Sequence, residues 1–324
     1  MLPWPLSEET PVSGTGDHVP VLLAETVRLL APPPGGVVAD GTLGAGGHAE
    51  ALLEAVGADG RLVGIDRDPV ALKRAGDRLA RFGGAFAPVH GRHEELPELL
   101  RGVGIFAADA ILFDLGLSSM QLDEAARGFS FRSDGPLDMR MDPTEGPTAA
   151  ELLEGASEAE LTRILRNWGE ERRARTIARA IVQERRRQPL TRTRQLAALV
   201  EKALGAGARR FRIHPATRTF QALRIAVNHE LDNLEAVLPQ AVGALNPGGR
   251  LAVISFHSLE DRIVKRFFRS LSRDQYDDRQ PVPQVARKAS LQLITRKPIT
   301  PSQQEQSENP RSRSAKLRIV EKIG

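Results

Sequence analysis

The chain has 324 residues, 41% apolar and 27% charged, which is ordinary for a globular protein and enough for one large or two smaller domains. It contains no cysteine, which excludes disulfides, thiolate catalysis and cysteine-ligated zinc, and no apolar run approaches the ~18 residues of a membrane span. The net charge of +4 is unevenly distributed, because residues 163–212 carry fifteen Arg or Lys against four Glu.

The N-terminal region predicts a tail followed by a helix. Residues 1–16 are rich in Pro, Ser, Gly and Thr, which predicts a disordered tail. Met1–Leu6 is short, broken by proline and without a basic leader, so it does not read as a signal peptide. Together with the absence of cysteine, this leads us to expect a cytoplasmic protein. Apolar residues at helical spacing then predict a first helix between Val21 and Leu30.

A glycine-rich loop follows the first predicted strand. Val37–Asp40 is an apolar run ending in an acid, and Gly44-x-Gly46-x-x-Ala49 then leads into a helical pattern. This spacing fits a nucleotide-binding fingerprint, in which glycine lets the backbone turn tightly and approach a ligand. A second apolar strand, Arg61–Asp66, ends in an acid 22 positions after Gly44, where an acid can hold the ribose hydroxyls. The two elements together predict a site for a nucleoside cofactor.

Strands continue to alternate with helices as far as residue 114. A helix opening at Asp68–Pro69 is followed by strand-like runs at 85–90 and 107–114. This alternation predicts a parallel sheet with helices on both faces, and ligands bind at the carboxyl ends of such strands. The polar side chains at or just beyond those ends are Asp40, Asp66, His93 and Asp114.

The alternation then stops, and no run between residues 115 and about 213 has strand character. A capping pattern at Ser157 and apolar residues at helical spacing predict a helix there, followed by helices at 170–187 and 193–204. Residues 163–212 have a net charge of +11, and nearly all of the positive charges are arginines. The arginine guanidinium forms bidentate hydrogen bonds with phosphate. We interpret this segment as a surface for nucleic acid, with a solvated helical face as the alternative.

The α/β pattern resumes after residue 214. The predicted elements are a long helix from Phe220 to Leu238, a strand at 250–256, a helix at 259–270, a loop at 274–288, and strands at 289–294 and 315–320. A closing strand pair of this kind distinguishes the methyltransferase version of the fold from the dehydrogenase version. The predicted fold class is therefore α/β, a Rossmann-like class I methyltransferase sheet domain (residues 17–118 and 214–324) with an inserted all-helical domain (119–213).

Several motifs resemble a known family. They are His18–Leu22, Asp40–Thr42, Gly44–His48, Ile65–Pro69, Asp114–Asp123, Arg127–Phe131, Gly135–Met141, His214–Gln221 and Ser255–Arg262. The chain is similar through them to bacterial S-adenosylmethionine-dependent methyltransferases of the MraW or RsmH type, which modify the exocyclic N4 of a cytosine in the decoding region of 16S ribosomal RNA. The chain departs from the family pattern in its longer N-terminal tail, in Met120 where proline is frequent, and in His93 where an aromatic such as Phe is common.

The resemblance implies a cofactor, a partner and roles for single residues. The cofactor is S-adenosylmethionine and the partner is 16S ribosomal RNA, free or within the small subunit. Gly46, Gly47 and His48 would hold the methionine end of the cofactor and Asp66 its ribose. The remaining cofactor contacts would come from His93, Asp114 and Gln121. We expect no metal, because His90-x-x-His93 has no further ligands beside it.

The chemistry requires a group that aims a poor nucleophile. The lone pair of the cytosine amino group is delocalised into the ring, and an acceptor for its N–H groups would orient it and disperse developing charge. Asp114 is the best-placed carboxylate, serving the cofactor, the cytosine or both. Phe129 and Phe131 either stack an extruded base or belong to the core of the insert. His257 is a second candidate for the target pocket.

Two other functional classes account for part of the sequence. A nicotinamide-dependent dehydrogenase fits the glycine loop and Asp66 but leaves the arginine-rich segment unexplained. A non-catalytic RNA-binding protein fits that segment but does not need a complete cofactor loop. The methyltransferase hypothesis accounts for both the cofactor loop and the arginine-rich segment.

Overall fold

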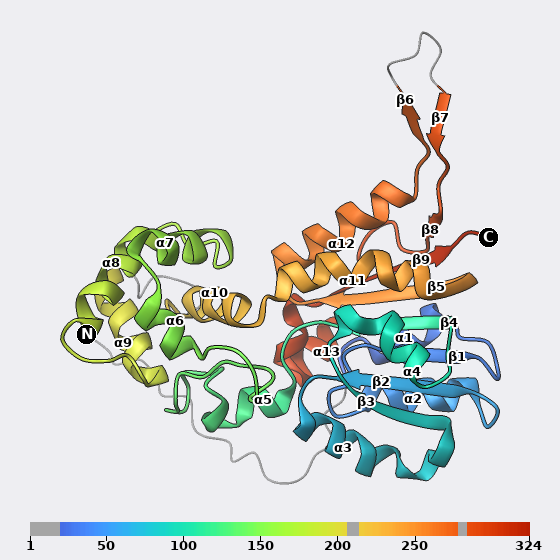
Figure 1. The fold of residues 1–324 in the computed structure, drawn as a ribbon, viewed down its shortest axis with the longest axis horizontal. Coiled ribbons are helices and arrows are strands. Elements are labelled where there is room, and N and C mark those ends of the chain that lie inside the picture. Colours follow the sequence, from blue (N-terminus) through green and yellow to red (C-terminus); the bar gives the residue numbers. More distant parts are fainter. Residues whose placement is uncertain (1–19, 206–213, 278–283) are drawn as a thin grey trace.

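A seven-stranded sheet forms the centre of the larger part of the molecule (Figure 1). The computed structural model describes residues 20–205, 214–277 and 284–324, and the tail expected over residues 1–16 lies outside these ranges. The strands of the sheet are β1 (Val37–Asp40), β2 (Arg61–Asp66), β3 (Phe86–His90), β4 (Ala108–Asp114), β5 (Leu245–Ser255), β8 (Leu291–Leu293) and β9 (Lys316–Lys322).

The strand order confirms the predicted fold class. The order is β3-β2-β1-β4-β5-β9-β8, with β1 to β5 parallel, β9 antiparallel to β5 and β8 antiparallel to β9. The closing pair predicted near 289–294 and 315–320 is therefore present as β8 and β9. Since the order reverses at β1 and β4, the carboxyl ends of these two strands border a crevice where ligands bind in such sheets.

Helices cover both faces of the sheet. One face carries α1 (Leu23–Leu30), α2 (Gly47–Val56) and α3 (Pro69–Leu79), and the other carries α4 (Leu96–Gly102), α11 (Glu230–Ala244) and α12 (Ser258–Leu271). Two separate apolar clusters result, one around Leu52 and Leu79 and the other around Leu238 and Phe268. None of the helices in the described ranges is both long and apolar enough to cross a membrane.

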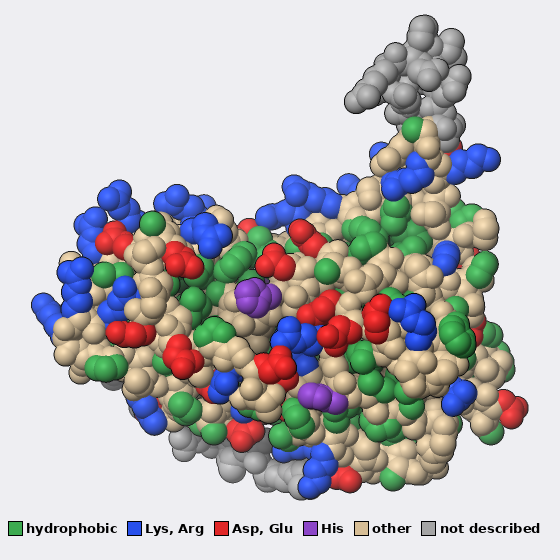
Figure 2. Space-filling view, viewed as in Figure 1, with side chains coloured by type: hydrophobic (Ala, Val, Ile, Leu, Met, Phe, Trp, Pro, Cys, Tyr) green, Lys and Arg blue, Asp and Glu red, His purple; other side chains and the backbone are tan. Residues whose placement is uncertain are grey.

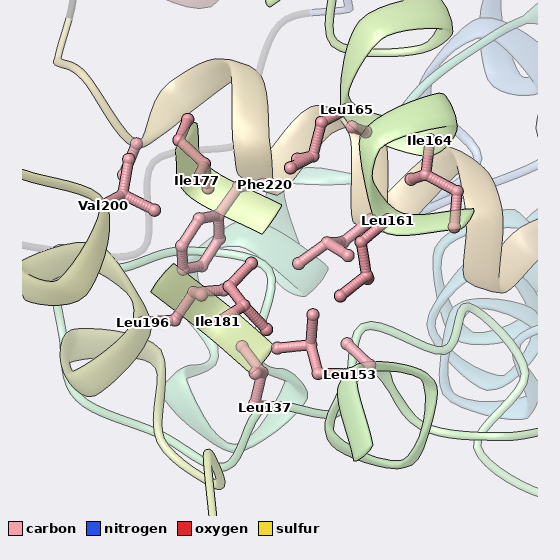
Figure 3. Close-up of a cluster of buried hydrophobic side chains, with 14 of the residues drawn as sticks. Leu137, Leu153, Leu161, Ile164, Leu165, Ile177, Ile181, Leu196, Val200 and Phe220 are labelled. Atoms are coloured by element: carbon pink, nitrogen blue, oxygen red, sulfur yellow. The ribbon is translucent and has the colours of Figure 1, made fainter. Parts of the chain in front are cut away.

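Five further helices form a separate apolar cluster beside the sheet, which we call the helical part. Its helices are α6 (Ala149–Gly155), α7 (Glu158–Asn167), α8 (Ala174–Arg185), α9 (Thr193–Leu204) and α10 (Thr217–Asn228). Leu161, Ile177, Ile181 and Phe220 meet in its interior (Figure 3). Because Phe220 lies in α10, this helix packs with the helical part although it follows residue 213. The domain division at 119–213 stays a prediction.

The long helix predicted from Phe220 to Leu238 is wrong, because it consists of two helices. His229 separates α10 from α11 and has a left-handed backbone (φ 51°). Asn228 stabilises the break, since its side-chain amide donates to the Met139 carbonyl (2.7 Å) and its oxygen accepts from the Met141 backbone N–H (2.7 Å). One left-handed residue leaves the apolar spacing nearly unchanged, so the sequence pattern continues across the break.

The loop predicted at residues 274–288 is also wrong in part. It contains the antiparallel pair β6 (Gln275–Asp277) and β7 (Gln284–Arg287), which projects away from the sheet (Figure 1). Asp274, Gln275 and Arg287 are exposed. A ribbon that extends into solvent buries no face, so the alternation of apolar and polar residues that reveals a strand is absent.

Candidate functional site

A cleft of about 1140 Å³ lies at the carboxyl ends of the sheet strands. It is lined by the loops that follow β1, β2 and β4, by residues at the end of β5, by α5 (Ser119–Asp123), and by the junction of α10 and α11. The cleft therefore borders both the sheet and the helical part. Of the predicted site residues, those that line it are Gly47, His48, Asp66, His93, Asp114 and Gln121.

The glycine loop is held in place by Asp66. One carboxylate oxygen of Asp66 accepts from the Gly44 backbone N–H (2.8 Å) and the other from the Asp68 N–H (2.9 Å). Burial raises the pKa of Asp66, although these two bonds act to lower it. Asp66 thus already has a loop-building role, and its further lone pairs remain for a ligand hydroxyl. The predicted contact with a ribose stays a prediction.

Gly46 and Gly47 differ in what surrounds them. Gly46 has a left-handed backbone (φ 79°), and a Cβ atom there would lie 3.2 Å from Leu79 Cδ1, so it faces α3 rather than the cleft. A Cβ atom on Gly47 would lie 2.4 Å from Pro20 Cγ, so a side chain there would force Pro20 to move. A larger residue at position 46 would consequently disturb the packing against α3 and strain the left-handed backbone, beyond any effect on the space for a ligand.

His48 and Asp114 face each other at the base of the cleft. His48 Nε2 lies 3.5 Å from Asp114 Oδ2, and His48 is 5% exposed. Among the described residues, neither ring nitrogen of His48 nor Asp114 Oδ1 has a hydrogen-bond partner. The Asp114 backbone N–H donates to Thr42 Oγ1 (2.6 Å), which fixes the end of β4 beside the loop. Buried polar atoms without partners mark a place where a ligand would supply them.

His93 is a buried imidazole beside the same loop. Its ring lies 5.8 Å from the ring of Phe113, and its Nε2 has no hydrogen-bond partner among the described residues. Burial, together with the charge of Arg67, lowers the pKa of His93 to about 3. The ring is therefore neutral at physiological pH. Burial raises the pKa of Asp40, at the end of β1, to about 7.

We expect His93→Phe to reduce the loss of stability on acidification. In the unfolded chain His93 takes a proton near pH 6.5, whereas the folded chain resists it until about pH 3, so the free energy of unfolding falls as pH decreases below 6.5. At pH 5 the variant should therefore regain up to about 2 kcal/mol of the free energy of unfolding that wild type loses on acidification. Denaturant unfolding of both proteins at pH 7.5 and pH 5 measures it. Asp40 changes the free energy of unfolding with pH in the opposite direction, but it is present in both proteins and cancels in the comparison. If the free energies of unfolding of the two proteins change equally between pH 7.5 and pH 5, the expectation is contradicted.

Gln121 belongs to a buried network at the rim of the cleft. Its side-chain amide donates to Asp68 Oδ2 (3.1 Å), which also accepts from Arg127 Nη1 (2.7 Å). Its carbonyl oxygen accepts from the Ser118 backbone N–H (3.2 Å) and completes a capping box on α5. The side chain thus positions α5 against the start of α3, and its contact with a cofactor stays a prediction.

The remaining predicted residues lie outside the cleft lining. Phe129 is buried in the helical part, and Phe131 packs 4.9 Å from Phe220 in ring-centroid distance, which supports the interpretation that both belong to the core of the insert. His257 lies at the start of α12 with Nε2 3.1 Å from Glu260 Oε1. His257 Nδ1 accepts from the Glu260 backbone N–H (3.4 Å), and the buried Glu260 lines the cleft.

The cleft residues that were not identified from the sequence include Arg224, Glu230 and Phe256. Arg224 and Glu230 stand on either side of the break at His229, inside what the sequence presents as one helix. Phe256 follows the last residue of β5, at the same sheet edge as Asp114. Its position directly after a parallel strand is the sequence feature that could have identified it as a site residue.

Comparisons with known proteins agree on one family. Residues 15–323 match the family described as MraW methylase family. The chain is 52% identical over 308 residues to Ribosomal RNA small subunit methyltransferase H of Trichlorobacter lovleyi, covering 95% of this chain and 98% of the relative. It is 51% identical to the proteins of the same name from Thermomicrobium roseum (98% of this chain, 97% of the relative) and Geobacter sulfurreducens (95% and 100%).

Solved structures with a similar outline are far more distant in sequence. They include an rRNA-methylase from Clostridium thermocellum (11% identity, TM-score 0.45, covering 95% of this chain and 98% of that one). Another is a methyltransferase from Streptococcus mutans in complex with SAH (10% identity, TM-score 0.44, covering 94% and 100%).

Proposed function

We propose that this chain, which belongs to the MraW methylase family, transfers a methyl group from S-adenosylmethionine to the exocyclic N4 of a cytosine in the decoding region of 16S ribosomal RNA. The observation that carries the proposal is the pairing of His48 with Asp114 at the carboxyl end of β4, beside the glycine loop held by Asp66. The small-subunit rRNA named for the relatives supports the substrate.

The residues of the cleft fit such a cofactor. The unpartnered polar atoms of His48 and Asp114 are buried on the same side as the glycine loop. The Asp66 carboxylate would accept from the ribose hydroxyls, and the loop from Gly44 to His48 would hold the methionine end. S-adenosylmethionine, when bound, supplies a methyl group on a positively charged sulfur.

Asp114 is the residue we assign to the reacting base. Its free oxygen would accept an N–H of the cytosine amino group, which aims the nitrogen lone pair and disperses the positive charge that develops there. His48 lies within 3.5 Å and limits the rotation of the carboxylate. Methyl transfer in this site depends mainly on alignment, since in-line displacement needs little further help from the protein.

The helical part would hold the RNA backbone. Lys and Arg side chains gather on its outer surface and over α12 (Figure 2). Of the three consecutive arginines at the end of α8, Arg185 donates to the Leu153 carbonyl and to the Ala156 carbonyl (2.6 Å), so it serves the end of α6. Arg186 and Arg187 are exposed. These two side chains are therefore the candidates for phosphate contacts.

The double variant Arg186→Gln/Arg187→Gln should weaken RNA binding several-fold at moderate salt. If both arginines contact phosphates, the slope of log affinity against log salt becomes shallower by about 1.4–1.8 units. The matched control is Arg61→Gln/Arg101→Gln, which removes the same charge from exposed positions outside the helical part. An unchanged slope with lowered stability would show that the two arginines only complement the end of α8.

The function itself is tested by mapping N4-methylcytosine in small-subunit rRNA from cells with and without the gene. We expect one modified cytosine to disappear when the gene is removed, and purified protein with S-adenosylmethionine to restore it. Binding of S-adenosylmethionine but not NAD separates this function from that of a dehydrogenase. If the rRNA of the two strains carries the same N4-methylcytosine positions, or none in either strain, the proposal is refuted.

A further inference from the structure

A buried ion pair faces the cleft where α10 meets α11. Arg224 Nε donates to Glu230 Oε1 (2.8 Å) and Arg224 Nη2 donates to Glu230 Oε2 (2.7 Å). The two side chains are 15% and 8% exposed, and both line the cleft. Arg224 Nη1 has no acceptor among the described residues. The pair therefore presents a free N–H donor next to a carboxylate that can accept further bonds.

A second buried carboxylate, Glu260, lies beside this pair. Glu260 Oε2 accepts from the backbone N–H groups of Phe256 (2.8 Å) and His257 (3.1 Å), and His257 Nε2 lies 3.1 Å from Glu260 Oε1. Burial acts to raise the pKa of Glu260, but His257 and the charge of Arg224 outweigh it, and the pKa lies below its usual range. A buried ion pair adds little to stability, since desolvation offsets its attraction, so stability alone does not account for the pair.

Phe256 supplies an apolar surface beside the ion pair. It is half-buried and follows β5, and its ring lies against Gly116, where an added Cβ atom would be 3.3 Å from the Phe256 Cδ2. Gly116 has φ +103°, which favours glycine, and a side chain at this position would press on the ring. Among the described residues that line the cleft, Phe256 is the only Phe, Tyr or Trp.

Resting on the proposed function, we propose that Arg224, Glu230 and Phe256 form the pocket that holds and identifies the target cytosine. Cytosine presents an N4 donor next to the N3 and O2 acceptors. Glu230 accepts from one N4–H, Arg224 Nη1 donates to N3, and the base stacks on Phe256. The second N4–H is left for Asp114 at the end of β4. Uracil would place its O4 acceptor against the Glu230 carboxylate, so the pocket rejects it.

The same corner could also be considered as a cation site. Glu230, His257 and Glu260 each bring one ligand atom within 4.8 Å of the others. However, both oxygens of Glu230 are bound by the Arg224 guanidinium, whose positive charge opposes a divalent cation. The arrangement favours a neutral base with mixed donors and acceptors over a metal ion.

The test compares cytosine with 3-deazacytosine, which lacks the N3 acceptor, at the target position of a small-subunit rRNA fragment. We expect wild-type protein to bind and methylate the cytosine RNA about tenfold better or more. Arg224→Lys keeps a positive charge beside Glu230 but removes the outer guanidinium donor. Its preference for cytosine over 3-deazacytosine should fall to about threefold or less, in affinity without cofactor and in kcat/KM.

The matched control is Arg250→Lys. Arg250 also pairs with a carboxylate, with Nε 2.9 Å from Glu321 Oε2, but this pair joins β5 to β9 outside the cleft. Its preference for cytosine should equal that of the wild type. A second cleft variant, Glu230→Gln, should prefer cytosine over uracil RNA less than the wild type does, because its amide can donate to the uracil O4. Some preference should remain, since Arg224 Nη1 still favours the N3 acceptor of cytosine, and a purely structural role of Glu230 would leave the preference unchanged.

Each outcome bears on one proposal. Wild-type protein that does not distinguish 3-deazacytosine from cytosine overturns the pocket without reference to any variant, even if Arg224→Lys fails to fold. The pocket is also overturned if Arg224→Lys prefers cytosine over 3-deazacytosine as strongly as the wild type does. It is likewise overturned if EDTA abolishes methyl transfer and a divalent cation restores it. If wild-type protein methylates no cytosine in the rRNA, the proposed function is wrong instead.

Discussion

Single-turnover methyl transfer by Asp114→Asn should be more than tenfold slower than that of the wild type, with RNA affinity unchanged. The substitution keeps the shape of the side chain but replaces a carboxylate oxygen by an NH₂ donor. The buried Oδ1, which has no partner among the described residues, is the atom assigned to the cytosine amino group. A donor facing N4–H would repel it, and the loss of charge stabilisation in the transition state raises the barrier by at least about 1.4 kcal/mol.

Rapid mixing of preformed enzyme–RNA complex with labelled cofactor measures this step without product release. Asp109→Asn is the matched control, since Asp109 lies at the opposite end of β4, where it accepts from the Val37 N–H (2.8 Å). It should transfer methyl groups at the wild-type rate. Normal turnover of Asp114→Asn at saturating cofactor would reassign Asp114 to a structural role.

Asp66→Ala should weaken cofactor binding by about 1.5–3 kcal/mol, which is roughly tenfold to 150-fold in Kd. The change removes a charge-assisted bond to the ribose and also the acceptor that holds the Gly44 N–H at 2.8 Å. Both losses act in the same direction, because a looser glycine loop is less ordered for binding.

Titration calorimetry with S-adenosylmethionine measures the effect, with thermal unfolding as the check that the chain is folded. Asp66→Asn separates the two contributions, since it retains one acceptor for the loop but lacks the charge. We expect its affinity to lie between those of wild type and Asp66→Ala. A change below about twofold in both variants would contradict a contact between Asp66 and the ribose.

Local patterns in the sequence were sufficient for the sheet, the glycine loop and most helices. The strands ending at Asp40, Asp66 and Asp114 were identifiable because each is a short apolar run with an acid at its end. Asp68 was identifiable as the start of a helix, and its side chain indeed accepts from the Val70 N–H (3.0 Å). These features depend on a few neighbouring residues, whose backbone preferences act over one or two turns.

Local sequence patterns therefore identify the side chains that follow the strands, whereas packing between distant segments sets which of these side chains have free atoms facing the cleft. Gln121 reaches Asp68 across 53 residues. Arg224 and Glu230 converge because one left-handed residue, His229, breaks a helix whose apolar spacing continues nearly unchanged. Phe129 and Phe131 instead pack within the helical part, whereas Phe256 lines the cleft. Such outcomes depend on long-range packing, since the burial and partners of a side chain are set by segments distant in sequence.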